Sequence, residues 1–184
     1  MLVIAMETGS RPRGRARWAG RRHDDDQPDA VSGSSPAELF HAVFHALHDG
    51  EQVALGIDCA LTVPVSSDAE PAATRPGLAE LGHVLGELGT WRPWTTVSTS
   101  LARWKANTSI LVWQAVPAPG SGEVAAGAAA DSFFRQLGRA TAQPADEDAG
   151  SVVNLAAAAA RRAGLFVDPS ELARPAVSFT VTGS

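Results

Sequence analysis

The sequence has almost no cysteine. Cys59 is the only one among 184 residues, so no internal disulfide can form. The paired Cys-x-x-Cys spacing of a structural zinc site is also absent. Nothing in the cysteine usage therefore points to an oxidising compartment.

Long apolar runs are missing as well. The apolar stretch at residues 1–6 is too short for the core of a secretion signal, and arginines follow it instead of preceding it. No stretch approaches the roughly 18 apolar residues that a membrane span needs. We therefore expect a soluble, cytoplasmic protein.

Basic charge is scarce overall but locally concentrated. The chain has 15 Lys and Arg against 20 Asp and Glu, a formal net charge of −5, so its overall charge does not favour nucleic acid as a partner. Alternating arginines follow the opening stretch and could bind a phosphate backbone along one face of a hairpin: Arg11, Arg13, Arg15 and Arg17. The interpretation that we favour is a solvated strand face, neutralised by the nearby acids Asp24–Asp26.

Apolar residues make up 45% of the chain, which is enough for a sizeable core. The length suits one domain, so we expect a single domain over residues 1–184. Polar stretches without periodicity predict flexible loops near residues 21–34, 66–76 and 143–150.

Short apolar runs predict the buried strands. Leu2–Met6, Val53–Ile57 and Ser109–Val116 have the continuous apolar character of strands that are covered on both faces. Gly14–Ala19 is expected to return beside the first strand as a hairpin. The alternation in Val177–Val181 predicts a half-exposed edge strand.

Four longer segments and one short one predict helices. The first begins with Ser35-Pro36-Ala37-Glu38, a capping box with proline in the first turn, and ends at Asp49-Gly50. The others are expected at Leu78–Leu88, Ser98–Ala106, Ala125–Leu137 and Val152–Ala163. After the second helix, Trp91 and Trp94 are expected to cap the edge of the core. The alternation of strands and helices predicts an α/β protein with a mixed sheet.

Two acids stand at the predicted ends of strands. Glu7 ends the first strand and Asp58 directly follows the central one. Open α/β sheets usually place their ligand sites at this carboxyl edge. Two alternatives stay open for Asp58: a functional carboxylate, or an anchor that accepts hydrogen bonds from the loop backbone. Asp131 lies in the later alanine-rich helix.

The order of these elements resembles the ribonuclease H-like fold. In that fold a hairpin meander is followed by a helix that crosses to a central parallel strand, and strands and helices close the chain. The loop Asp58–Pro64, and the closing segments Asn154–Gly164 and Val177–Val181, look like an uncharacterised bacterial family of this fold. The resemblance implies an α/β, ribonuclease H-like mixed sheet with helices packed on it.

The resemblance also implies a chemistry. Acids at the strand tips and on a late helix of that fold hold divalent ions, which activate water and stabilise the leaving oxygen in phosphodiester hydrolysis. Glu7, Asp58 and Asp131 match those positions, as catalytic residues and ligands of Mg²⁺, a cation that prefers oxygen ligands. The first hypothesis is therefore a magnesium-dependent nuclease that acts on nucleic acid. The alternative is a catalytically inactive binding or scaffold domain of the same fold.

Two departures from the family pattern concern this site. Glu7 stands where these nucleases usually have aspartate, and Gln114 lies on the third strand where a carboxylate would help. Glu38 could serve as a further acid from the first helix, but its part in the capping box explains it better.

Other reactive side chains receive structural interpretations. His41, His45 and His48 share one helix face, where two imidazoles could bind a transition metal. A partly buried, hydrogen-bonded histidine face is the interpretation we favour. Cys59 follows an anion that disfavours the reactive thiolate, so we expect a small buried thiol and not a nucleophile.

Overall fold

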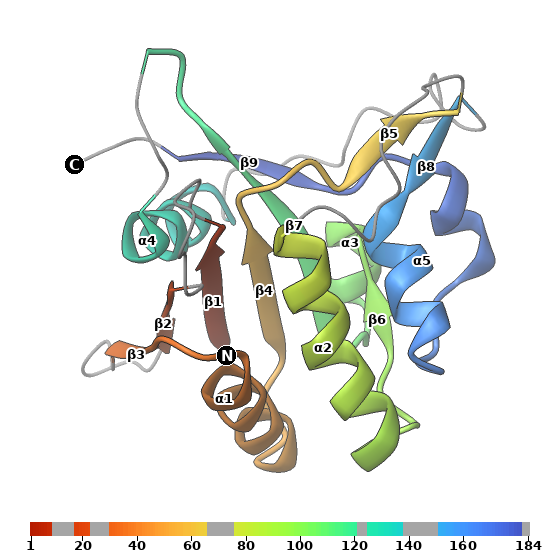
Figure 1. Ribbon diagram of the computed structural model, residues 1–184, viewed down its shortest axis with the longest axis horizontal. Helices are drawn as coiled ribbons and strands as arrows, with labels where there is room; N and C mark the ends of the chain where they lie inside the picture. The colour runs from red at the N-terminus through yellow and green to blue at the C-terminus, as the bar shows by residue number, and fades with distance from the viewer. Residues whose placement is uncertain (9–16, 23–29, 66–75, 121–124, 138–150, 182–184) are drawn as a thin grey trace.

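The computed structural model describes residues 1–8, 17–22, 30–65, 76–120, 125–137 and 151–181. Within these residues the chain forms a seven-stranded mixed sheet with helices packed on both faces (Figure 1). The predicted α/β class and mixed sheet are therefore confirmed. No helix in the described ranges combines the length and the apolar character needed to cross a bilayer.

The main sheet has the strand order β3-β2-β1-β4-β7-β6, and β9 also pairs with β7. Its strands are β1 (Leu2–Glu7), β2 (Arg17–Arg22), β3 (Ala30–Gly33), β4 (Val53–Ile57), β6 (Val97–Ser98), β7 (Ile110–Pro117) and β9 (Ser178–Val181). The first three form an antiparallel meander, whereas β4, β6, β7 and β9 run parallel to β1. A separate antiparallel pair joins β5 (Thr62–Pro64) to β8 (Val152–Asn154).

Helices cover the two faces of the sheet and bury two apolar layers. The helices are α1 (Pro36–His48), α2 (Pro76–Trp91), α3 (Leu101–Lys105), α4 (Ala126–Leu137) and α5 (Leu155–Arg162). Side chains alternate across β1, so Ile4 and Met6 pack with α1, α2 and α5, whereas Val3 and Ala5 pack with α3 and α4. Because both faces are covered, the central strands are apolar along their whole length, as the sequence predicts.

The start of α1 has the predicted capping box. The Ser35 hydroxyl accepts the backbone N–H of Glu38, and the Glu38 carboxylate accepts the backbone N–H groups of Ser34 and Ser35. These bonds hold the pKa of Glu38 below its usual value. Pro36 occupies the first turn, where its missing N–H costs nothing.

Several segments differ from the sequence-based expectation because distant segments pair with them. Thr62–Pro64, expected in a loop, form β5, and Ser98, expected to begin a helix, lies in β6, so α3 starts at Leu101. Residues 30–33, expected in a flexible loop, form β3 because they satisfy the outer edge of β2. Residues 152–154, expected in a helix, form β8 against β5, and the helix begins only at Leu155. Its cap is Asn154, which accepts the N–H of Ala157. The loop expected near 66–76 lies outside the described residues except for Pro76, which begins α2, and the loop expected near 143–150 lies outside them entirely.

Two expectations about aromatic and imidazole side chains are wrong. Trp91 and Trp94 do not cap the core, since their side chains are 62% and 63% exposed. The three histidines of α1 are exposed and not partly buried. Phe44 of the same helix is partly buried against the core, and its ring stacks on that of His48 with the centroids 6.4 Å apart. The alternation in β9 is confirmed.

Candidate site at the carboxyl ends of the central strands

Glu7 and Asp58 lie side by side at one edge of the sheet. β1 and β4 are adjacent parallel strands in which Met6 pairs with Ile57, so the residues that follow are neighbours. Both acids therefore stand at the carboxyl ends of central strands, where open α/β sheets bind ligands (Figure 1).

The carboxylate of Glu7 is held by a helix. Its Oε1 accepts the backbone N–H of Ala126, the first residue of α4, at 2.7 Å. The first N–H groups of a helix have no partner inside the helix and carry partial positive charge, so they stabilise an anion. Glu7 is thereby fixed at the sheet edge on the α4 side.

The carboxylate of Asp58 anchors the chain that leaves β1. Its Oδ1 accepts the backbone N–H of Thr8 at 2.7 Å and also the Thr8 hydroxyl. Burial raises the pKa of Asp58; the two Thr8 hydrogen bonds oppose this, and the negative charge of Glu7 adds to it. The loop-anchor role that was one alternative for Asp58 is thus present, and it uses Oδ1.

Glu80 is a third acid near Asp58, which the sequence reasoning missed. A Cβ at Gly77 would lie 3.0 Å from Ile57 Cδ1 and 3.1 Å from Cys59 Sγ, so the first turn of α2 packs directly against the site. Burial raises the pKa of Glu80, and the charge of Asp58 raises it further. Its Oε2 is buried without a hydrogen-bond partner in the described part of the chain.

A weak signal for Glu80 exists in the sequence. Glu80 follows Gly77 by three positions and precedes Val84 by four, so the three residues share one side of a helix. Gly77 and Val84 are both buried, and a carboxylate between buried positions is unusual without a role.

Asp131 does not join this group. Its Oδ1 forms an ion pair with Arg21 Nε at 3.2 Å. Arg21 pairs with Val3, four positions before Glu7 on β1, which corresponds to about 13 Å along the strand. The structure therefore makes the backbones of Glu7 and Asp58 neighbours, whereas Asp131 forms an ion pair with Arg21 instead of joining a three-acid cluster.

The other residues singled out in the sequence have structural roles or lie elsewhere. The Gln114 side chain accepts the N–H of Leu61 at 3.1 Å and holds the loop after Asp58. Cys59 is half-buried behind Gly77. Arg17 lies opposite Glu7 in the β1–β2 register, and Arg11, Arg13 and Arg15 lie outside the described residues.

These residues fit one hydrated divalent ion and not a cage of three ligands. In the described ranges no three His, Cys, Asp or Glu side chains converge on one point. Among the side chains that the structure describes, a set that excludes Arg17 opposite Glu7, no arginine or lysine forms an ion pair with Glu7 or Asp58. Mg²⁺ commonly takes one or two protein carboxylates and completes its shell with water and substrate phosphates. Glu7 and Asp58 supply two carboxylates of this kind from adjacent strand ends.

A shallow cavity opens beside Glu7. Its volume is about 400 Å³ and its lining includes Trp18, Gly33, Ser34 and Glu38. The cavity gives a ligand access to Glu7 from the side of β2 and β3. Glu38 lines the cavity, and its Oε2 accepts hydrogen bonds from the backbone N–H groups of Ser34 and Ser35.

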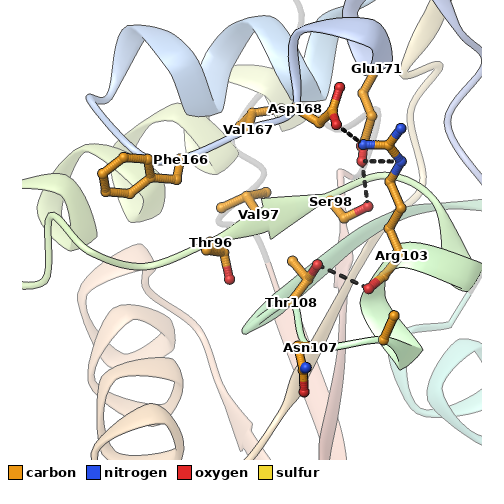
Figure 2. Close-up of a pocket in the computed structure, with 11 residues that line it drawn as sticks. Thr96, Val97, Ser98, Arg103, Asn107, Thr108, Phe166, Val167, Asp168 and Glu171 are labelled. Atoms are coloured by element: carbon orange, nitrogen blue, oxygen red, sulfur yellow. Dashed lines mark hydrogen bonds and ion pairs between the residues drawn. The ribbon is translucent and has the colours of Figure 1, made fainter.

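A second cavity beside β6 is structural. Figure 2 shows Arg103 pointing toward Asp168 and Glu171 across a space of about 430 Å³. Arg103 forms an ion pair with Asp168, and its Nε lies 3.8 Å from Glu171. A hydrogen bond from the Ser170 side chain, with the Arg103 pair, lowers the pKa of Asp168 to about 2.

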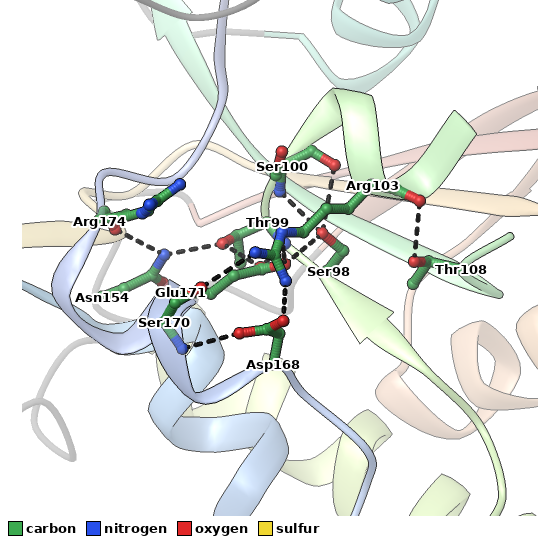
Figure 3. A network of polar contacts seen from close by, with 10 residues as sticks. All are labelled: Ser98, Thr99, Ser100, Arg103, Thr108, Asn154, Asp168, Ser170, Glu171 and Arg174. Atoms are coloured by element: carbon green, nitrogen blue, oxygen red, sulfur yellow. Dashed lines mark hydrogen bonds and ion pairs between the residues drawn. The ribbon is translucent and has the colours of Figure 1, made fainter. Parts of the chain in front are cut away.

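Glu171, the buried carboxylate beside that cavity, also has hydrogen-bond partners for both of its oxygens. Glu171 accepts hydrogen bonds from the Ser98 hydroxyl at 2.6 Å, the Thr99 hydroxyl at 2.7 Å and the Thr99 N–H at 2.5 Å (Figure 3). Asn154 extends the network by donating to the Thr99 hydroxyl at 2.8 Å. Because these groups satisfy one another, the network fastens the segment after α5 to β6 and leaves little for a ligand to recognise.

Comparison with known proteins gives no match: no family model, no curated protein and no solved structure resembles the chain. Function therefore has to be inferred from the residues at the strand ends.

Proposed function

We propose that this chain is a ribonuclease H-like domain that binds a divalent metal ion, Mg²⁺, between Glu7 and Asp58 and hydrolyses phosphodiester bonds in nucleic acid. One observation carries the proposal. Two acids stand at the carboxyl ends of adjacent parallel strands, where their backbones are neighbours, and no ion pair of the described side chains joins either acid to an arginine or lysine.

The strand order supports the fold assignment in this proposal. An antiparallel meander β1–β2–β3 is followed by α1, which crosses to β4 beside β1, and β7 then lies beside β4. This order is the one that the resemblance to ribonuclease H-like proteins implies. A cytoplasmic location, expected from the single cysteine, belongs to the same proposal.

The roles of the residues follow from their contacts. The N–H of Ala126 orients Glu7, and Thr8 orients Asp58, so both carboxylates are positioned before any ion arrives. A bound divalent ion would supply a polarised water and stabilise the charge of the leaving oxygen.

The alternative, a catalytically inactive binding or scaffold domain, has its own supporting observations. No three acids in the described ranges converge on one point. Both strand-end acids also bond to backbone N–H groups, which is a structural role. The net charge of −5 opposes the approach of a polyanion.

Metal binding is tested by thermal unfolding with millimolar Mg²⁺ or Mn²⁺. A ligand that binds only the native state raises Tm, by the equivalent of about 2.7 kcal/mol at 100 times its Kd. We expect the shift in the unchanged protein and in Asp131→Asn, and its loss in Asp58→Asn and Glu7→Gln. An unchanged melting curve in the unchanged protein would refute the metal site.

Catalysis is tested with end-labelled single-stranded RNA, single-stranded DNA, duplex DNA and RNA–DNA hybrid. We expect Mg²⁺-dependent cleavage of at least one substrate, absent in Asp58→Asn purified in parallel. Metal binding without cleavage of any substrate would support the inactive domain.

A further inference from the structure

A groove between α1 and α2 lies on the outer surface of the helical layer. Its volume is about 520 Å³, within the usual range for small-molecule sites. Two helical stripes line it, Ala37, Phe40, His41 and Phe44 from α1 and His83, Glu87 and Trp91 from α2. Residues spaced by three or four positions share one helix face, so each stripe forms a continuous wall.

Phenylalanine and tryptophan supply three of the seven lining residues. The ring centroids of Phe40 and Phe44 are 5.7 Å apart, and the ring planes are tilted by 43°. Trp91 ends α2 on the other side of the groove, with 62% of its side chain exposed. A large ring left in water beside an aromatic groove is costly for a monomer, and such exposed apolar surface marks binding sites.

The charge of the groove selects the kind of ligand. Glu87 is the one formally charged residue that lines it, and no lysine or arginine contributes to its walls in the described part of the chain. The faces of aromatic rings also carry partial negative charge. Ring faces and a carboxylate together attract a cation and repel an anion.

We propose that the groove between α1 and α2 binds a small organic ammonium cation, with the alkyl groups against Phe44 and Trp91 and the charge near Glu87. A quaternary ammonium suits this lining best, because it is weakly hydrated and presents apolar methyl groups to the rings. The imidazoles of His41 and His83 complete the polar part of the walls.

This site is independent of the proposed metal site. Gly77, at the start of α2, packs against residues that flank the strand-end acids, Thr8, Ile57 and Cys59, whereas Trp91 is fourteen positions later and about 21 Å along the helix. Loss of metal binding would therefore leave the ammonium site unaffected, and the reverse also holds.

The experiment compares choline with its neutral carbon isostere, 3,3-dimethylbutanol, by titration calorimetry and by tryptophan fluorescence. We expect saturable millimolar binding of choline and about tenfold weaker binding of the isostere. Trp91→Leu and Glu87→Gln should each weaken choline binding about fivefold. The matched controls are Trp94→Leu, an equally exposed tryptophan outside the groove, and Asp49→Asn, an exposed acid at the end of α1.

Several results would overturn the proposal. Equal affinity for choline and the isostere would show an apolar groove without selectivity for charge. No saturable binding of choline, or weakening by Trp94→Leu as large as that by Trp91→Leu, would remove the site. Co-sedimentation with phosphatidylcholine vesicles that free choline does not compete would assign the face to a membrane surface. Circular dichroism verifies that the variants stay folded, which is expected because Trp91 is exposed and Glu87 is partly exposed.

Discussion

Four glycines of α2 should respond in opposite directions to the same substitution by alanine. A Cβ at Gly82 or Gly86 would meet no other atom within 4 Å. A Cβ at Gly89 would overlap the backbone carbonyl oxygen of Ala163 at the end of α5, and one at Gly77 would overlap the Thr8 methyl group. One helix thus offers two test positions and two matched controls.

The expected magnitudes follow from these contacts. Alanine is favoured over glycine in a helix interior by about 1 kcal/mol, so Gly82→Ala and Gly86→Ala should each raise the free energy of unfolding by that amount. In a chain of this size 1 kcal/mol corresponds to about 2–4 °C in Tm. At Gly89 the overlap is with backbone, which cannot rotate away, and overpacking costs about 1–3 kcal/mol. This cost exceeds the helix gain, so Gly89→Ala should destabilise by about 1–2 kcal/mol.

Gly77→Ala has an additional consequence at the candidate site. Its Cβ would push against Thr8, which donates two hydrogen bonds to Asp58. We expect destabilisation by about 1–2 kcal/mol and a weakened response of Tm to divalent metal. The assay is urea unfolding for all four variants, with calorimetry to measure Tm. Destabilisation by Gly82→Ala and Gly86→Ala together with a neutral Gly89→Ala would refute the packing of α2 described above.

Two further predictions concern buried carboxylates. Because the pKa of Asp58 is raised in the folded state, the stability it contributes is full below its unfolded pKa and is lost as pH rises through the folded value. In metal-free buffer, Asp58→Asn should therefore be more stable than the unchanged protein at about pH 7, and this difference in the free energy of unfolding should shrink as pH falls to about 4. The assay is urea unfolding across this pH range. A variant that is less stable than the unchanged protein at neutral pH would contradict the prediction. Glu171→Ala should cost about 3–5 kcal/mol, because it leaves buried donors of Ser98 and Thr99 without an acceptor, whereas Glu171→Gln should cost about 1–3 kcal/mol. The measurement is denaturant unfolding of both Glu171 variants. If each variant lowered the free energy of unfolding by the same amount, less than about 1 kcal/mol, the network would contribute little to stability.

Local sequence determined the elements whose signals lie within a few residues. The strands β1, β4 and β7 follow from continuous apolar runs, because a short run of this kind can be buried only between two covering layers. The start of α1 follows from Ser35 and Glu38, whose side chains accept each other's backbone N–H groups, and from Pro36 in the same turn. The places of Glu7 at the end of β1 and of Asp58 directly after β4 follow from the same runs, whereas their adjacency depends on the pairing of β1 with β4.

Only the tertiary structure decided the features that depend on distant partners. β3 and β8 exist because β2 and β5 offer them unpaired edges, and their own residues carry no strong strand signal. Arg21 on β2 forms an ion pair with Asp131, whereas the close approach of α2 at Gly77 brings Glu80 near Asp58. The exposure of Trp91 likewise depends on where α2 ends relative to α1. A backbone or side-chain group finds such partners only when chain segments far apart in sequence meet, and no local pattern records that meeting.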